Sequence, residues 1–454
     1  MPTWTFSPYG LAPIFVGVSI MHNTRNYNNM YKKNLAPTVS ILESIQNLPP
    51  NLRDTLTDTQ WDDKTKYFYR LHLPFEKSWS NLWRDHIECS TFQADPCDSH
   101  FEEGNNKGCL IRIDASEGQI HVFQIHVENM GFLIIESQFP CTYNDMNRYR
   151  YAISLSFGLV TTVALLDYTI VMASETVEFD NIIERGVVQL RPTIKSQYRF
   201  FTTDLYGLGW LRHKVDYDVF RPYCDEKGNL KGRLDPMTEQ EFSGLVSMLH
   251  RSKDLARATM MLLVASNDIE YLGPLYSVVL ETVTLVITEE KKELFSDYTD
   301  AKGEKRDIYN SEKLKDPFER IQQIGYELSG IEKQIIKSRN KYLHGTLPEG
   351  GENIDELLYN CIELRKLCGI LLFRYAGYKG PILNNAVERR LEKALANKEP
   401  LFITYDEEAA KELVKKRKNE KRKEKEEKNN KQSQGKNNNQ SQGNEKSSPA
   451  NGRA

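Results

Sequence analysis

The chain has 454 residues, a formal net charge of −3, 39% hydrophobic residues and 27% charged residues. These values are typical of a soluble protein with two or three domains, each large enough to bury a core. They exclude a small chain stapled by disulfides. The near-neutral charge says little about partners, because local patches matter more than the sum. The seven cysteines are odd in number and no signal peptide is visible, so we expect a cytoplasmic protein with reduced thiols.

The first region, residues 1–235, is predicted to be a mixed, strand-rich domain. Its clearest signal is residues 109–139, where the β-branched and aromatic runs CLIRIDA, IHVFQIHVE and FLIIESQF are separated by short turn sequences. This pattern predicts a three-stranded antiparallel meander. Further strand-like stretches follow at 187–190 and 197–203, and residues 37–88 are expected to be partly helical.

The apolar stretch Ile153–Ala173 is almost long enough to span a membrane. Asp167 lies inside it, and a carboxylate at the centre of a bilayer costs about 2.5–3.5 kcal/mol. A helix through about Leu165, followed by a buried strand from Tyr168, fits these residues better. No membrane association is therefore expected.

Residues 236–395 are predicted to form an all-helical domain. Thr238 and Glu241 have the spacing of a capping box. They precede one expected helix at about 239–265, and a second is expected at 269–290, with an apolar stripe of Leu275, Val278, Val279, Val283 and Val286.

Two further helices complete the predicted bundle. The third is expected to begin at Asp316-Pro317, with Asp as N-cap and Pro in the first turn, and to end near Gly345. The fourth is expected after Asn353. Four helices with short or polar links favour an antiparallel bundle. The overall prediction is an α+β fold with a disordered tail at 406–454, where residues 411–436 carry twelve Lys/Arg against five Glu.

The end of the third helix brings together chemically useful side chains. Asn340 and His344 are four residues apart and share a helix face, and the long side chain of Arg339 can reach the same surface. RNA cleavage without a metal needs a proton carrier and a cation opposite the phosphorane, which histidine and arginine supply. Asn340 can orient the imidazole or bind a phosphate oxygen. The alternative from spacing alone is that Arg339 and His344 only cap the helix end.

The motif Arg339-Asn340-x-x-x-His344 resembles the R-N-x-x-x-H motif of the HEPN superfamily, whose helical bundles carry it at the end of a late helix. Glu281 resembles the acidic residue that some HEPN proteins place opposite the motif. The stretch 375–384 is similar to the ApeA-like antiphage branch, in which a large N-terminal domain precedes the HEPN domain. Lys341 and Tyr342, inside the motif, are supporting candidates.

This resemblance implies a homodimeric, metal-independent endoribonuclease with no cofactor. It leaves 2′,3′-cyclic phosphate ends and acts in abortive infection after a phage trigger, often on tRNA. The N-terminal domain would then sense the trigger or restrain the nuclease. The alternative is a non-catalytic HEPN module that binds RNA or a protein partner, or a motif that only closes a dimer interface.

Other clusters give weaker signals. His86, Cys89, Cys97 and His100 have the short spacings of zinc ligands, although few residues separate the two pairs. The alternative is surface histidines with partly buried cysteines. His121 and His126 lie five positions apart in a predicted strand, so they should face opposite sides of the sheet and cannot share one site.

Overall fold

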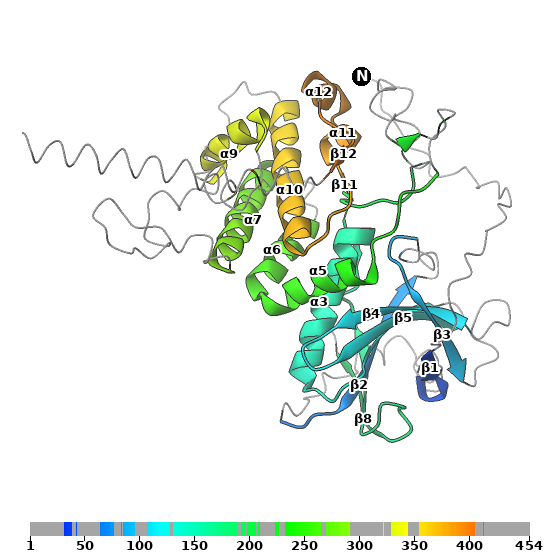
Figure 1. Cartoon of the computed structure of the whole chain (residues 1–454). Helices are drawn as coiled ribbons and strands as arrows, with labels where there is room; N and C mark the ends of the chain where they lie inside the picture. The colour runs from blue at the N-terminus through cyan, green and yellow to red at the C-terminus, as the bar shows by residue number, and fades with distance from the viewer. Residues whose placement is uncertain are drawn as a thin grey trace, which may run out of the picture.

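A computed structural model of the chain describes the following residues: 31–38, 42, 64–76, 83, 85–95, 107–127, 130–188, 192–196, 198–205, 208, 223–224, 226, 232–264, 269–290, 321, 328–343, 354–404 and 412. The described part is α+β, as predicted: a strand-rich region comes first and helices follow. Figure 1 shows the sheet on one side and the helices α7, α9 and α10 on the other.

The main sheet has eight strands in the order β1-β3-β4-β5-β6-β2-β8-β9. The predicted meander is confirmed, because β4, β5 and β6 pair antiparallel in sequence order. The sequence missed β2, which lies in a region expected to be partly helical and sits between β6 and β8. The strands are β1 Tyr31–Asn34, β2 Phe68–Glu76, β3 Ser90–Asp95, β4 Lys107–Asp114, β5 Gln119–Val127, β6 Met130–Ser137, β8 Thr169–Ser174 and β9 Ile182–Val188.

Alternation of side chains along the strands gives the sheet two different buried faces. Ile120 and Val122 belong to the main apolar core, whereas Phe123 and Ile125 belong to a second cluster on the opposite face. His121 lies on the second face, so the predicted separation from His126, which contacts Phe75 of the main core, is confirmed. Two further strands were predicted, at 187–190 and at 197–203. The first prediction overlaps the end of β9, and the described part of the second, residues 198–203, is not a strand.

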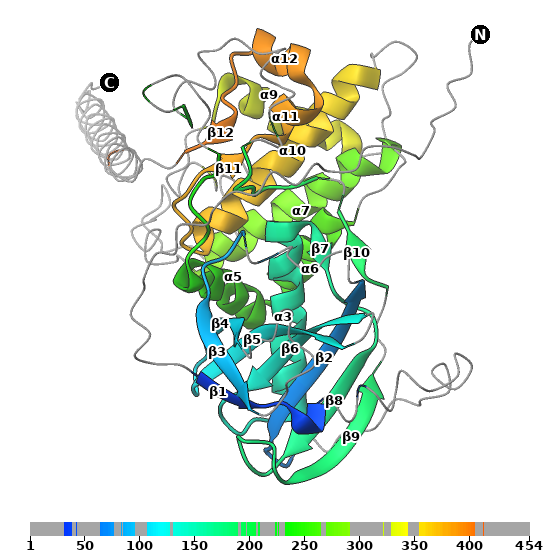
Figure 2. The same cartoon turned by 90° about the vertical axis from the view of Figure 1, so that its right-hand side faces the viewer.

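The helix α3, Tyr143–Thr161, packs on the main-core face of the sheet (Figure 2). Its first turn is capped by the Thr142 side chain, which accepts a hydrogen bond from the Asp145 amide. It ends at Thr162 in the left-handed conformation, and the short strand β7, Val163–Ala164, pairs with β10, Ile194–Lys195. The apolar stretch is therefore a buried helix followed by the buried strand β8, as predicted, but the helix ends at Thr161 and not near Leu165.

The prediction of one helix at about 239–265 is wrong. The structure has two helices there, α5 Glu239–Arg251 and α6 Lys253–Leu263, joined at Ser252. The Ser252 hydroxyl accepts from the Leu255 amide and so starts a new helix. The capping box of Thr238 and Glu241 is confirmed at the start of α5.

The second predicted helix is confirmed as α7, Ile269–Glu290. Val279, Val283 and Val286 are buried as expected, but Val278 is 43% exposed and Tyr271 is 66% exposed. Among the described residues, α7 has the one stretch long and apolar enough to cross a membrane, and 61% of it is buried inside the protein. A core helix gives the same pattern, so this finding carries no argument for a membrane.

The third predicted helix is not continuous, because Leu328 and Ser329 are not helical. The helix α9 spans Gly330–Leu343 and begins with a capping box: the Ser329 amide donates to the Glu332 carboxylate at 2.8 Å, and the Glu332 amide donates to the Ser329 hydroxyl at 3.1 Å. Residues 316–320 lie outside the described part, and Ile321 is helical. The segment 329–332, predicted to be helix interior, therefore marks a helix start.

The fourth helix is confirmed as α10, Ile354–Tyr375. It is buried on nearly all sides, because the C-terminal segment, residues 382–403, covers the side that α7 and α9 leave open (Figure 1). This segment contains β11 Ile382–Leu383, α11 Asn385–Arg389, α12 Leu391–Ala396 and β12 Phe402–Ile403. The predicted inward residues are buried or partly buried, but Glu363, Arg365 and Lys366 are buried as well.

Residues on the two sides of the expected boundary at 235 share one core. The main apolar cluster contains Tyr69 of β2, Leu245 of α5 and Leu364 of α10. The Arg112 guanidinium of β4 pairs with the Glu239 carboxylate of α5 at 2.5 Å. The division at 235 therefore stays a prediction, and the two regions pack against each other through α3, α5 and α6.

A close approach between α5 and the end of α10 gives a test of this packing. A Cβ atom at Gly244 would lie 2.4 Å from the carbonyl oxygen of Ala376, which is backbone and cannot move aside cheaply. We expect Gly244→Ala to lower the free energy of unfolding by about 1–3 kcal/mol, as overpacking does. Gly330→Ala is the control, because nothing lies within 4 Å of its Cβ; it should be neutral or stabilising by up to about 1 kcal/mol. Urea unfolding measures both, and equal stability of the two variants would contradict the packing.

Candidate functional site

Arg339 of α9 lies opposite Glu281 of α7. The guanidinium Nη2 is 3.5 Å from the Glu281 carboxylate, and Nη1 donates to the carbonyl oxygen of Ile336 at 3.2 Å. The two residues are 58 positions apart in sequence, so the packing of two helices brings them together. Glu281, which by resemblance is expected opposite the motif, is adjacent to Arg339.

The burial of the pair is uneven. The Arg339 side chain is 9% exposed, whereas the Glu281 side chain is 39% exposed. Apolar residues on α9, Ile335 and Ile336, pack into the core and fix the helix against its neighbours. A guanidinium in such a position is preorganised, because its Glu281 contact limits its rotation and low solvent access weakens screening. It can offer a fixed positive charge to an anion that reaches the α7–α9 surface.

The rest of the motif lies beyond the described part. The side chains of Asn340, Lys341 and Tyr342, and all of His344, are outside it.

Known protein families, curated proteins and solved structures were compared with this chain, and none matches it.

The expected zinc cluster is only partly described. The His86 imidazole lies 3.3 Å from the Thr203 hydroxyl and packs edge-on against Phe201, and burial lowers the pKa of His86. Cys89 is half-buried, and Cys97 and His100 lie outside the described residues. Within the described ranges, no three His, Cys, Asp or Glu side chains are grouped as metal ligands. His86 thus contacts Thr203 and Phe201, and Cys89 is half-buried. The zinc site stays a prediction.

A buried charge cluster that includes Glu332 of α9 was not predicted from the sequence. The Lys366 ammonium of α10 is 2.5 Å from Glu363, 3.0 Å from Glu399 and 4.0 Å from Glu332. These four side chains are at most 8% exposed. Glu363 and Lys366 are three residues apart, which on a surface helix is an ordinary exposed pair. Glu363 and Lys366 are buried because the C-terminal segment, residues 382–403, packs over α10.

Three carboxyl groups around one ammonium cannot all be ionised at low cost. Burial and the neighbouring Glu399 carboxylate raise the pKa of Glu363 from 4.5 to about 8, against the opposing effect of Lys366. Glu363 is therefore the group that keeps a proton near neutral pH. The groups that interact with it come from α10 (Lys366 and Tyr359) and from the C-terminal segment (Glu399), and Glu332 of α9 contacts the same Lys366 ammonium.

This cluster predicts a pH dependence of stability. Because the pKa of Glu363 is higher in the folded protein, its contribution is full below 4.5 and is lost as the pH rises through about 8. Relative to Glu363→Gln, the wild type should lose up to about 1.4 kcal/mol of unfolding free energy per pH unit in that window. Urea unfolding at several pH values measures the difference. A constant difference between the two proteins from about pH 5 to pH 8 would contradict the assignment.

Proposed function

We propose that this protein is a metal-independent endoribonuclease of the HEPN type. The observation that carries the proposal is the pairing of Arg339 with Glu281 across two helices. The R-N-x-x-x-H motif and the resemblance of Glu281 to an opposing acidic residue support it from the sequence. The helices α7, α9 and α10, which pack on one another, are consistent with part of a HEPN bundle.

The proposed reaction is an internal transfer at phosphorus. The ribose 2′-oxygen attacks the adjacent phosphorus and loses its proton, and the 5′-oxygen leaves with a proton. The products are a 2′,3′-cyclic phosphate and a 5′-hydroxyl end. Arg339 stabilises the charge of the phosphorane, His344 transfers a proton, and Asn340 positions the imidazole or the phosphate. Glu281 orients the guanidinium.

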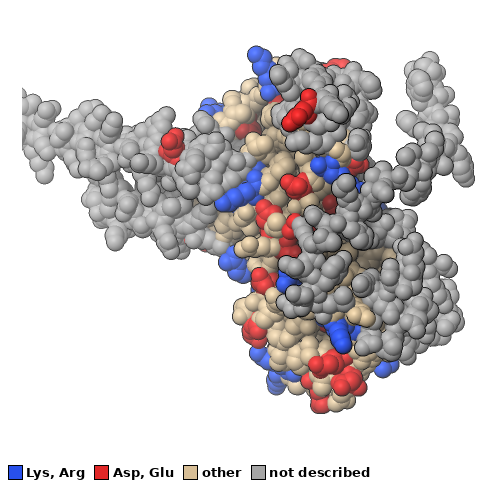
Figure 3. All heavy atoms as spheres, turned by 45° about the vertical axis from the view of Figure 1, so that its right-hand side comes forward, with Lys and Arg blue, Asp and Glu red and all other residues tan. Residues whose placement is uncertain are grey.

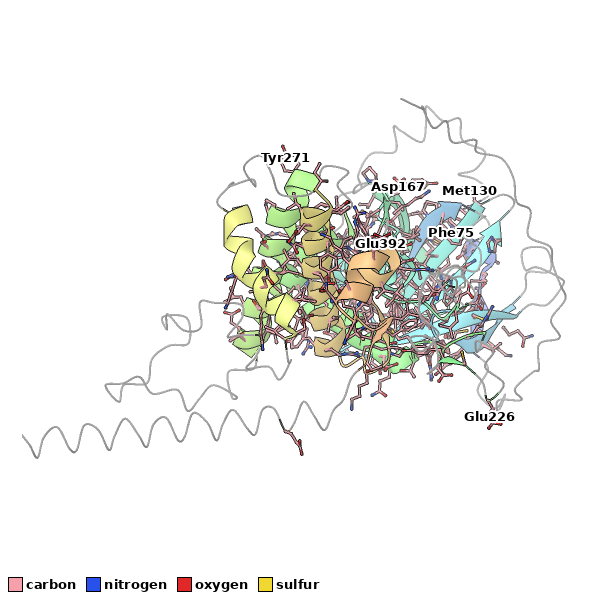
Figure 4. All side chains as sticks on the ribbon, turned by 90° about the horizontal axis from the view of Figure 1, so that it is seen from above. Phe75, Met130, Asp167, Glu226, Tyr271 and Glu392 are labelled. Atoms are coloured by element: carbon pink, nitrogen blue, oxygen red, sulfur yellow. The ribbon has the colours of Figure 1, made fainter. Side chains whose placement is uncertain are left out.

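A second copy of the chain is the partner that we propose for the exposed side of α7. Tyr271 and Val278 lie on that side, 66% and 43% exposed, and Glu281 follows one turn later. Figure 4 shows Tyr271 at the outer edge of the molecule. A two-fold contact there would bring two Arg339 sites close together. By resemblance to the ApeA-like branch, we further propose a cytoplasmic antiphage role with tRNA among the candidate substrates and a phage component as trigger.

A second function, a module that binds RNA or a protein without cutting, does not require Arg339 to reach a phosphorane. Arg339 is largely buried and ion-paired, which suits a structural role as well as a catalytic one. Charges on the face shown in Figure 3 are interspersed, so the described part of that face offers no single large basic surface that would identify RNA as the ligand.

Growth and binding assays separate the two functions. For the enzyme, expression with the phage trigger should arrest growth, and His344→Ala should abolish the arrest while RNA binding is retained. For the binding module, His344→Ala should leave both the growth and the RNA affinity of the wild type unchanged. Growth without harm in the presence of phage would contradict the nuclease.

A further inference from the structure

Lys366 is a buried cation contacted by carboxyl groups from three parts of the chain. Glu363 belongs to its own helix, Glu399 to the C-terminal segment and Glu332 to the start of α9. The side chain of Lys366 is 5% exposed, so water cannot replace a lost carboxylate partner at low cost. The position of its ammonium therefore depends on two elements that are otherwise distant in sequence.

The Glu399 contact holds the end of the C-terminal segment. Besides Lys366 at 3.0 Å, the Glu399 carboxylate accepts hydrogen bonds from the Asn384 amide at 2.9 Å and from the Tyr359 hydroxyl. The preceding residue, Lys398, has φ of 55°, a left-handed backbone that a non-glycine residue adopts at a cost. The Glu399 amide donates to the carbonyl oxygen of Ala394 at 2.9 Å, so Lys398 occupies the left-handed position that ends α12. Glu399 is thus fixed by the helix end as well as by its carboxylate contacts.

The Glu332 contact holds the start of α9. One oxygen of Glu332 accepts from the Ser329 amide in the capping box, and the other faces Lys366 at 4.0 Å. A charge-assisted N–H···O bond is about 2.7–2.9 Å long, so the ammonium needs to move by roughly an ångström to bind Glu332 directly. Glu399, at 3.0 Å, already has the shorter contact.

We propose that Lys366 is a shared counter-ion for which the C-terminal segment and α9 compete. When Glu399 withdraws, the ammonium turns to Glu332 and tightens the start of the helix that carries Arg339. When Glu399 docks, the ammonium is drawn away and the start of α9 relaxes. The docking of residues 382–403 and the rigidity of α9 are therefore inversely linked, whether or not Arg339 takes part in RNA cleavage.

Hydrogen exchange of the full-length protein tests this link. Glu399→Gln removes the charge with little change of shape, so exchange in residues 391–403 should become at least ~10-fold faster, while exchange in 330–337 should become slower. Glu332→Gln should do the reverse, because glutamine retains the capping box but not the charge. Glu392→Gln, an exposed residue of the same segment (Figure 4), is the matched control and should change neither region.

Two results would overturn the proposal. If Glu399→Gln speeds exchange in both regions, Lys366 is a rigid joint and no competition exists. If exchange in 330–337 is unchanged in Glu399→Gln, the two elements are not linked through Lys366. Should Glu399→Gln fail to fold, Glu332→Gln decides alone: slower exchange in 391–403 supports the competition, and unchanged or faster exchange there refutes it.

Discussion

Arg339→Ala should lower the rate of RNA cleavage by ~10²–10³-fold, the usual effect of removing one group that stabilises a charged transition state. The guanidinium is fixed by Glu281 at 3.5 Å and by the carbonyl oxygen of Ile336, so it pays little to reorganise during the reaction. Arg339→Lys should recover little, because an ammonium lacks the planar fork that contacts two oxygens at once. Initial rates on one RNA substrate, with enzyme in excess, measure the effect.

The control is Arg257→Ala on α6. The Arg257 side chain is 73% exposed and has a weak contact with Asp254 at 4.0 Å, so its removal should leave the cleavage rate unchanged. Thermal unfolding of each variant separates lost chemistry from lost structure. A folded Arg339→Ala variant with the cleavage rate of the wild type would show that Arg339 has a structural role only.

Glu136→Ala should lower the free energy of unfolding by about 3–5 kcal/mol, as when one partner of a buried ion pair is removed. The Glu136 carboxylate of β6 is 2.6 Å from the Arg70 guanidinium and also pairs with the Lys33 ammonium, and all three side chains are at most 5% exposed. Removal of Glu136 leaves the buried Lys33 and Arg70 without their shared carboxylate on the second face of the sheet. Arg70 also donates to the carbonyl oxygen of Asn34, so the loss should release the first strand, β1.

The matched control is Glu117→Ala in the turn before β5. Glu117 is 55% exposed and pairs with Lys66 at 3.4 Å, so its removal should cost at most about 1 kcal/mol. Urea unfolding followed by circular dichroism compares the two variants. A loss below about 1 kcal/mol for Glu136→Ala would mean that these charges do not anchor β1 to the sheet.

Local patterns in the sequence predicted the elements whose signals are local. Alternating β-branched residues identified the meander, and the Thr238–Glu241 spacing identified the start of α5. The break at Ser252 and the start of α9 at Ser329 were missed because apolar periodicity continues across both. At these points a hydroxyl cap competes with helix continuation, and tertiary packing decides the outcome.

The burial of charged residues could not be predicted from the sequence. Glu363 and Lys366 have the spacing of a solvent-exposed pair, and only the return of the C-terminal segment over α10 places them inside. The Glu281–Arg339 pair was predicted by residue type and by resemblance, and helix packing brought the two together. Val278 of α7 was expected in the apolar stripe but is 43% exposed, because periodicity identifies a stripe but not its limits.

The most direct test of the central claim is cleavage of total cellular RNA by the purified protein in excess EDTA, with phage-infected lysate as a source of trigger. We predict that the wild type yields fragments with 2′,3′-cyclic phosphate ends and that His344→Ala cleaves ~10²–10⁴-fold more slowly. Equal cleavage by the two proteins, or no cleavage by the wild type even with infected lysate, would contradict the account.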